Sequence, residues 1–378
     1  MTMTTIWTLV FWLSAALVVH AFAGYPLWVR LLAKLRPRPV VVRDYLPTVT
    51  AIMSVYNARD QVLQKLHNLH ALDYPAGLLD IIVVCDGCSD GTAQAIADAS
   101  LPGVRVIDAP QRRGKSQCLD DAVALAEGEL LLMVDVRQRL EPGVLRALIA
   151  NLSDPAVGAV SGELLFEDAD NGFAASVDAY WRYEKMIRLA ESRSGSVVGV
   201  TGACYAMRRA LYRPLPPGTV LDDVLVPMQV VKAGSRVLFE PAAIAWDRAS
   251  TDSTREGVRK VRTLAGNYQL LALAPWLIDP LANPLWARFV SHKLLRLAVP
   301  WLLCALLVAT VLLAPRRPFY LACLVAAAAA MLLVLVATYV PAVAALKPVR
   351  LLLAFWHMNL YAARALLAYL RNPGLHLW

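Results

Sequence analysis

The chain has 378 residues, of which 58% are apolar and 17% are charged, against roughly 45–50% and about 25% in soluble domains. With a mean hydropathy of +0.50, this composition excludes a disordered chain and a single soluble domain. Charges concentrate in the middle of the chain, which predicts membrane segments on either side of one water-soluble domain. The net charge of +8 does not indicate nucleic-acid binding, because basic residues cluster beside the apolar runs, where they orient membrane helices.

The first apolar stretch, residues 6–29, is long enough to cross about 30 Å of hydrocarbon as a helix. It has no basic segment before it and no clear cleavage site, which argues against a signal peptide. We therefore predict a transmembrane helix over residues 1–30 in an integral protein of the plasma membrane. Basic residues follow at once, and the positive-inside rule then places the N-terminus outside and the next domain in the cytoplasm; they are Arg30, Lys34, Arg36, Arg38 and Arg43.

Residues 45–253 have the pattern of an α/β domain. Apolar strands are predicted over 48–55, 79–85, 104–108 and 129–135, with helices between them. This alternation is typical of a largely parallel sheet with both faces covered by helices. Ligands bind at the carboxyl ends of the strands in such sheets. Polar residues follow three of the predicted strands at that end: Tyr56 and Asn57, then Asp86, then Asp135.

The last third of the chain returns to apolar segments. Residues 254–289 have the pattern of amphipathic helices at a membrane surface, although an ordinary surface helix of the soluble domain also fits. Residues 290–340 contain two predicted transmembrane helices separated by a tight turn. Residues 341–378 are either a fourth span or an interfacial helix, because this apolar run carries polar side chains: His357, Asn359 and Arg364.

Two acidic residues stand at strand ends. Asp86 ends its strand with no evident local partner, whereas the nearby Asp90 suits an N-cap. Asp135 closes five apolar residues, where a carboxylate either belongs to a site or is costly to bury. Between these two residues lies the Gly114-Lys115-Ser116 run. It is not a P-loop, because Ala109 stands where that motif needs its first glycine.

Two further groups carry charge outside the strands. The adjacent Asp222 and Asp223 repel each other, which raises the pKa of one carboxyl and suits a general base, although a solvated N-cap pair is the plainer interpretation. Arg259 and Arg262, with Lys260 between them, fit either phosphate or lipid headgroups.

Taken together and in this order, these motifs resemble the family 2 inverting glycosyltransferases. The layout is closest to the membrane-integrated members, such as hyaluronan, chitin and poly-N-acetylglucosamine synthases and ceramide glucosyltransferase. The resemblance covers about residues 46–270 and is specific only as a set. It rests on residues 54–57, 86–92, 114–116, on Asp135, and on Asp222 and Asp223. It implies an α/β GT-A nucleotide-sugar-binding domain flanked by transmembrane helices.

The resemblance also implies roles for single residues. Tyr56 and Asn57 line the nucleotide pocket, Asp86 binds the base, and Lys115 lies near the uracil or the diphosphate. Asp135 contacts ribose and metal. Asp223, with Asp222 before it, deprotonates the acceptor hydroxyl, Arg262 clamps the diphosphate, and the acceptor side is formed by Gly202, Ala203 and Cys204.

Two positions depart from the family pattern. Arg137 replaces the second carboxylate of the DxD motif, so Mg²⁺ or Mn²⁺ is either held by fewer protein ligands or replaced by the guanidinium. Thr263 stands where the processive synthases have a tryptophan that stacks on the acceptor sugar, which puts processivity in doubt.

The sequence thus predicts a membrane-bound inverting glycosyltransferase that takes a sugar from a nucleotide diphosphate, most simply a UDP-sugar. The predicted acceptor is a polysaccharide or a lipid at the cytoplasmic face. Three or four spans are few for a polymer channel, which leaves a homo-oligomer open. The alternative is a catalytically silent subunit of a polysaccharide synthase that keeps the GT-A fold, and Arg137 is the feature that favours it.

Overall fold

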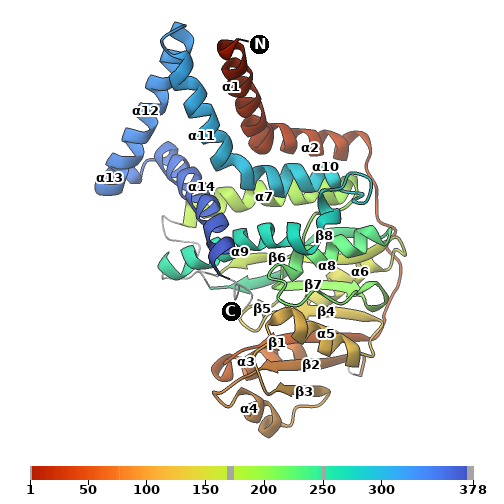
Figure 1. The fold of residues 1–378 in the computed structure, drawn as a ribbon. Helices are drawn as coiled ribbons and strands as arrows, with labels where there is room; N and C mark the ends of the chain where they lie inside the picture. The colour runs from red at the N-terminus through yellow and green to blue at the C-terminus, as the bar shows by residue number, and fades with distance from the viewer. Residues whose placement is uncertain (1, 76, 168–173, 249–252, 373–378) are drawn as a thin grey trace.

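The computed structural model describes residues 2–75, 77–167, 174–248 and 253–372. These residues form an eight-stranded sheet in the lower part of the view in Figure 1, with a group of long helices at its upper side. The spatial order is β3-β2-β1-β4-β7-β6-β8-β5, and the strands are β1 Val49–Val55, β2 Leu79–Asp86, β3 Val104–Ala109, β4 Leu130–Val134, β5 Arg139–Leu140, β6 Val157–Phe166, β7 Cys204–Arg208 and β8 Arg236–Asp247.

The four strands predicted from the sequence lie side by side and parallel, in the order β3-β2-β1-β4. The rest of the sheet is not parallel throughout: β7 runs antiparallel to β4 and β6, and β5 runs antiparallel to β8. The prediction of a largely parallel sheet is therefore wrong for this half, and the sheet is mixed. The reason is local, because Cys204 starts β7 opposite Val134, at the edge where β4 ends, so β7 must run back along β4.

Helices cover both faces of the sheet, as predicted. Since alternate side chains of a strand face opposite sides, Ala51 and Met53 of β1 pack into one core and Ile52 packs into the other. The first core includes α3 (Arg59–His70) and α6 (Val144–Leu152), with α4 (Thr92–Ala99) at its margin. The second includes α5 (Lys115–Leu125) and α8 (Asp222–Lys232).

Among the described residues, four helices are long and apolar enough to cross a membrane: Met3–Leu35, Trp286–Leu313, Pro318–Tyr339 and Lys347–Arg371. The last contains the segment for which the sequence left two alternatives. The elements outside the sheet and its covering helices are α1 Met3–Val19, η1 His20–Gly24, α2 Tyr25–Leu35, α7 Ala174–Ser194, η2 Arg209–Leu211, α9 Ser253–Leu273, η3 Pro275–Ile278, α10 Trp286–Phe289, η4 Val290–Leu294, α11 Leu295–Leu313, α12 Pro318–Tyr339, α13 Pro341–Ala344 and α14 Lys347–Arg371.

The first two of these apolar helices, Met3–Leu35 and Trp286–Leu313, bend at the same level (Figure 1). α1 and α11 rise away from the sheet, whereas α2 and α10 turn to lie along α7 (Figure 1). Each bend falls at a π-helical segment, η1 or η4, a common cause of kinks. The two segments touch through a hydrogen bond between His20 Nε2 and Ser291 Oγ at 3.1 Å. The sequence predicted one transmembrane helix over residues 1–30 without this bend, which places α2 in the layer that lies on the domain.

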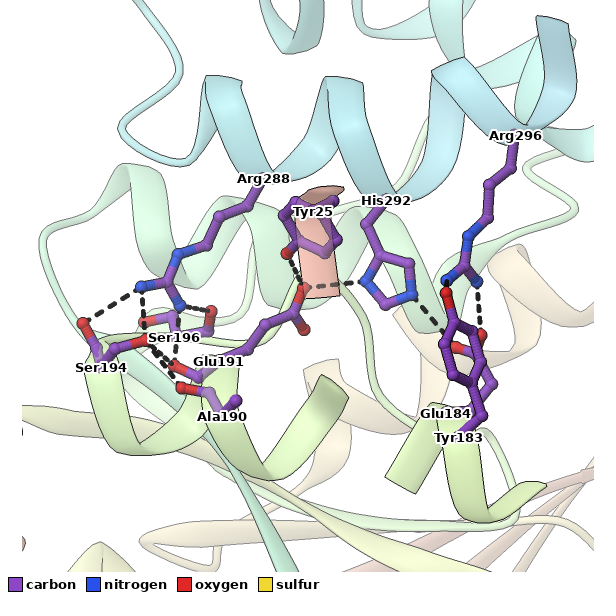
Figure 2. A network of polar contacts seen from close by, with 10 residues as sticks. All are labelled: Tyr25, Tyr183, Glu184, Ala190, Glu191, Ser194, Ser196, Arg288, His292 and Arg296. Atoms are coloured by element: carbon purple, nitrogen blue, oxygen red, sulfur yellow. Dashed lines mark hydrogen bonds and ion pairs between the residues drawn. The ribbon is translucent and has the colours of Figure 1, made fainter. Parts of the chain in front are cut away.

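A buried polar network joins this layer to the long helix α7 (Figure 2). Glu191 accepts hydrogen bonds from the hydroxyl of Tyr25 on α2 and from Nδ1 of His292, the latter at 2.8 Å. Nε2 of His292 lies 3.1 Å from Glu184, which also accepts from Arg296. A carboxylate can only accept, so both ring nitrogens carry protons and the imidazole of His292 is a cation. We call Tyr25, Glu184, Glu191, His292 and Arg296 the clasp.

The clasp makes a stability prediction. Tyr25→Phe keeps the packing of a fully buried ring but removes one donor from a buried carboxylate, so we expect it to cost about 1–3 kcal/mol and to lower the melting temperature in detergent. Tyr339→Phe is the matched control, because Tyr339 is 78% exposed. Equal melting temperatures for the two variants would contradict a role for the clasp in holding α2 on the domain.

Candidate active site

The polar residues predicted at the strand ends lie along one edge of the sheet. β2, β1 and β4 are parallel neighbours, and Asp86 ends β2 while Tyr56 and Asn57 follow β1 and Asp135 follows β4. Because carboxyl ends of parallel strands share an edge, this is where a ligand of such a sheet binds.

The loop before α5 is folded onto this edge by Asp86. Both oxygens of this fully buried carboxylate accept backbone hydrogens, from Arg113 N at 2.7 Å and from Gly114 N at 2.9 Å. The loop packs so closely that a Cβ on Gly87 would stand 2.6 Å from Arg112 N. The local partner that the sequence did not reveal is therefore the loop backbone.

Aromatic and amide groups line the next stretch of the edge. The guanidinium of Arg112 lies 3.8 Å from the centre of the Tyr56 ring, a cation–π distance. Asn57 has a positive φ of 47° and accepts a hydrogen bond from Ser89 N at 2.9 Å. The N-cap of α4 is Gly91, and Asp90, one residue earlier, accepts a hydrogen bond from Thr92 N at 3.0 Å, so the side chain predicted as an N-cap lies one position before it.

The centre of the candidate site is a group of three carboxylates around one lysine. Lys115 Nζ, at the start of α5, lies 3.0 Å from Asp135 Oδ1 and 3.3 Å from Asp222 Oδ2. Although burial lowers it, the charges of Asp135 and Asp222 raise the pKa of Lys115 above its usual value. The lysine therefore stays charged between two carboxylates that would otherwise repel each other.

Asp222 and Asp223 start α8, where the positive end of the helix dipole favours anions. Burial raises the pKa of Asp222, and Lys115 opposes the rise. Burial and the neighbouring charge of Asp222 raise the pKa of Asp223 to about 6. Oδ1 of Asp223 is buried and has no hydrogen-bond partner among the described residues. A carboxyl group in this state suits a general base near neutral pH.

Gly202 faces the same group from the turn before β7. A Cβ there would stand 3.4 Å from Lys115 Nζ and 3.7 Å from Asp135 Oδ2. Its neighbours differ, because Ala203 and Cys204 are buried in the first core cluster. Of the three residues predicted on the acceptor side, the structure brings only Gly202 to the carboxylates.

The two arginines that the sequence predicted in the site, Arg262 and Arg137, lie near different carboxylates. Burial and the charge of Arg259 lower the pKa of Arg262 on α9, while the charges of Asp222 and Asp135 oppose the lowering, so Arg262 is within electrostatic range of these carboxylates. Arg137 lies beyond them, with Nη2 3.9 Å from Asp247 Oδ2 at the end of β8.

A second polar group, which the sequence did not indicate, lies under Arg137. Gln138 Nε2 donates to Asp247 Oδ2 at 2.7 Å, and its backbone carbonyl accepts from the buried Lys65 Nζ at 2.7 Å. Burial lowers the pKa of Lys65 to about 8. No pattern in the sequence pairs β8 with the segment after β4, so only the fold could place Asp247 here.

Comparison with known proteins identifies the family to which this chain belongs. Residues 47–264 match the family described as "Glycosyltransferase like family 2", and the chain belongs to this family. It has the GT-A glycosyltransferase fold, and four of its described helices are long and apolar enough to cross a membrane. The predicted family and fold class are thereby confirmed.

Curated relatives with similar sequences include two N-acetylglucosaminyltransferases and one polysaccharide synthase. The protein from Rhizobium leguminosarum bv. viciae is 31% identical over 227 residues, 55% of this chain and 53% of the relative. The protein from Azorhizobium caulinodans is 28% identical over 216 residues, with coverage of 53% and 54%. The poly-beta-1,6-N-acetyl-D-glucosamine synthase of Staphylococcus aureus is 22% identical over 244 residues, with coverage of 63% and 58%. The chain spans about half the length of the curated relatives it matches.

One solved structure is similar over nearly the whole chain. A mannosyltransferase from Pyrobaculum calidifontis, solved with GDP-Man and Mn²⁺, superposes with a TM-score of 0.74 at 24% identity. The match covers 96% of this chain and 99% of that one. The similarity extends to the helices outside the sheet. At this level of identity it establishes the fold and not the activity.

The raised pKa of Asp223 makes a testable prediction about stability. A carboxyl whose pKa is higher in the folded state stabilises the fold at low pH and loses that contribution as pH rises through about 6. Asp223→Asn should therefore raise the melting temperature at pH 8 and change it little at pH 5, measured by thermal unfolding in detergent. Asp60→Asn, at an exposed position on α3, is the control. A shift that is the same at both pH values would contradict the buried, raised carboxyl.

Proposed function

We propose that this glycosyltransferase moves N-acetylglucosamine from UDP-N-acetylglucosamine to a hydroxyl group of a sugar chain or lipid at the membrane, with inversion. The observation that carries the proposal is the partly desolvated Asp223 beside the Lys115–Asp135 pair, a base next to a cationic binding group. The names of the curated relatives support N-acetylglucosamine as the sugar. GDP-mannose, bound by the structural neighbour, is the competing donor.

The residues at the sheet edge divide between donor and acceptor. Tyr56, with Asn57 beside it, would line the nucleotide pocket, and Asp86 would bind the base with the loop that it folds. Arg262 lies half-buried on α9, near the carboxylates, and would clamp the diphosphate. Gly202 leaves the space beside Asp223 open for the acceptor.

A divalent metal ion would fit this site if only a few of its ligands came from the protein. Among the described residues no cluster of three or more His, Cys, Asp or Glu side chains could hold an ion. Mg²⁺ is usually bound through one or two carboxylates together with substrate phosphates. Asp135 offers one oxygen beyond its contact with Lys115, so it would hold Mg²⁺ or Mn²⁺ with the donor diphosphate. The ion would neutralise charge on that diphosphate.

The residues of the chain then have separate tasks in one displacement. Asp223 accepts the proton of the acceptor hydroxyl as its oxygen attacks the anomeric carbon. The bond from that carbon to the diphosphate oxygen breaks, and the charge left on UDP faces Lys115 and Arg262. Lys115 also pairs with Asp222 and favours its ionised form. Asp223 is therefore the carboxylate that takes the proton. Attack opposite the leaving group inverts the anomeric centre.

The helical layer supports an acceptor at the membrane. Five basic residues between residues 30 and 43 follow the first apolar helix, so we propose that the domain faces the cytoplasm and the N-terminus the outside of the plasma membrane. The bent first and second apolar helices hold the domain against that surface. We propose no stoichiometry, and a homo-oligomer stays compatible with this arrangement.

The first experiment is UDP and GDP release by the purified chain in nanodiscs with a panel of UDP- and GDP-sugars. We expect release from UDP-N-acetylglucosamine, and a loss of at least about 100-fold in Asp223→Asn with nucleotide binding retained. Asp60→Asn is again the control. EDTA should lower the release if Asp135 holds an ion. Nucleotide binding without release from any donor would instead support a silent subunit.

Arg137 is tested separately. If its guanidinium offsets charge on the leaving diphosphate, Arg137→Ala should lower turnover more than it weakens nucleoside binding, because the charge develops only as the bond breaks. Arg146→Ala is the control, since Arg146 pairs with Asp73 on the surface. Unchanged turnover would leave Arg137 a surface partner of Asp247 with no part in the reaction.

A further inference from the structure

The second apolar helix, Trp286–Leu313, begins beside the segment that carries the proposed base, Asp223. Lys293 lies in the π-helical segment η4, and its Nζ is 3.7 Å from the point where a Cβ on Gly199 would stand. The backbone oxygen of Asp223 lies 3.5 Å from that same point and accepts a hydrogen bond from Val200 N at 2.9 Å. The ammonium group of Lys293 is therefore beside the first turn of α8, which carries the two carboxylates.

No hydrogen bond or ion pair to another described residue occupies the Lys293 ammonium. Lys115, by contrast, is engaged by Asp135 and Asp222. Asp223 thus has a lysine on either side. Lys115, on the donor side, is paired with two carboxylates, whereas Lys293, on the side of the membrane helices, has no such pair among the described residues.

The clasp fixes Lys293 in this position. Its chain neighbour His292 is held between Glu191 and Glu184, at 2.8 and 3.1 Å (Figure 2). Arg288, one turn earlier on the same helix, donates to the backbone carbonyls of Glu191 and Ser196. A π-helical turn holds one extra residue, which changes the direction of the side chains around it and is frequent at functional sites.

Other charges also surround Asp223, and any effect of Lys293 must be separated from theirs. Burial and the charge of Asp222 raise the pKa of Asp223, while Lys293 and then Lys115 oppose that rise. The charged or titratable groups around it, by element, are Asp222 on α8, Lys293 on η4, Lys115 on α5, Asp135 after β4, Arg188 on α7 and Tyr205 on β7.

We propose that Lys293, delivered by the second apolar helix, is a positioning residue of the active site, and that its positive charge holds the carboxylate of Asp223 ionised. This rests on the proposed function only in calling Asp223 the base. The charge pairing itself is independent of the reaction. The helix that anchors the protein to the membrane thereby contributes to the chemistry, through the clasp that holds it on α7.

A double-mutant cycle in the full chain tests the pairing without any substrate. Lys293→Met should lower the melting temperature at pH 8, where Asp223 is ionised, and have little effect at pH 5. In the Asp223→Asn background the loss at pH 8 should disappear. An equal loss in both backgrounds would overturn the proposal, because Lys293 would then only pack.

Activity gives a second readout that packing alone would not move. A nearby positive charge favours the ionised form of a carboxyl group, so Lys293→Met should move the acid limb of the turnover profile up by about one pH unit. The rate should be about fivefold lower near pH 6 and close to wild type at pH 8.5. Lys293→Arg should restore the profile, and Lys34→Met, an exposed lysine on α2, should leave it unchanged.

The two hypotheses fail differently. If Asp223 is not the base, Asp223→Asn retains turnover while the stability cycle still couples Lys293 to Asp223. If Lys293 does not act on Asp223, Asp223→Asn abolishes turnover while Lys293→Met keeps the wild-type pH profile and the cycle shows no coupling.

Discussion

Three carboxylates converge in this site, and they can do so only because a lysine stands between them. Asp135 and Asp222 each lie within ion-pair distance of Lys115 Nζ, in surroundings where an unpaired charge is costly. Lys115 opposes the rise that burial causes in the pKa of Asp222, whereas Asp223 has no ion pair among the described residues and its pKa is raised to about 6. The ammonium group of Lys115 therefore makes the two neighbouring carboxyl groups of α8 different from each other.

The sheet exists in this form to bring those residues together. Parallel β1, β2 and β4 place Asp86 and Asp135 at a common edge, and antiparallel β7 starts at that edge opposite β4. That reversal places the turn containing Gly202 against Lys115 and Asp135. A strand entering from the other end would have carried this turn away from the carboxylates.

The membrane helices are tied to the domain by buried charge as well as by apolar packing. The clasp holds α2 and the Trp286–Leu313 helix on α7, and each of its carboxylates has at least two donors. Buried ion pairs seldom add much net stability, but they are demanding in geometry. This geometry fixes the direction in which the helix leaves the domain, and with it the position of Lys293.

Hydrophobic patterning was sufficient to predict the first four strands, the flanking helices and the polar residues at the strand ends. Those features are local, because a run of apolar residues and the polar residue that ends it are set within a few positions. The resemblance to a known family added the roles of Asp223 and Arg262. It also extended the acceptor side to Ala203 and Cys204, which the structure buries in the core.

The sequence by itself determined the class of protein, the order of its elements and the charges available to the site. The tertiary structure alone decided that β7 runs antiparallel, that the first and second apolar helices bend, and that Lys115 lies between Asp135 and Asp222. The pairing of His292 with Glu184 and Glu191, about a hundred residues earlier, belongs to the same group. Each depends on contacts between distant segments, and such contacts leave no periodicity in a single chain because either partner alone is an ordinary charged residue.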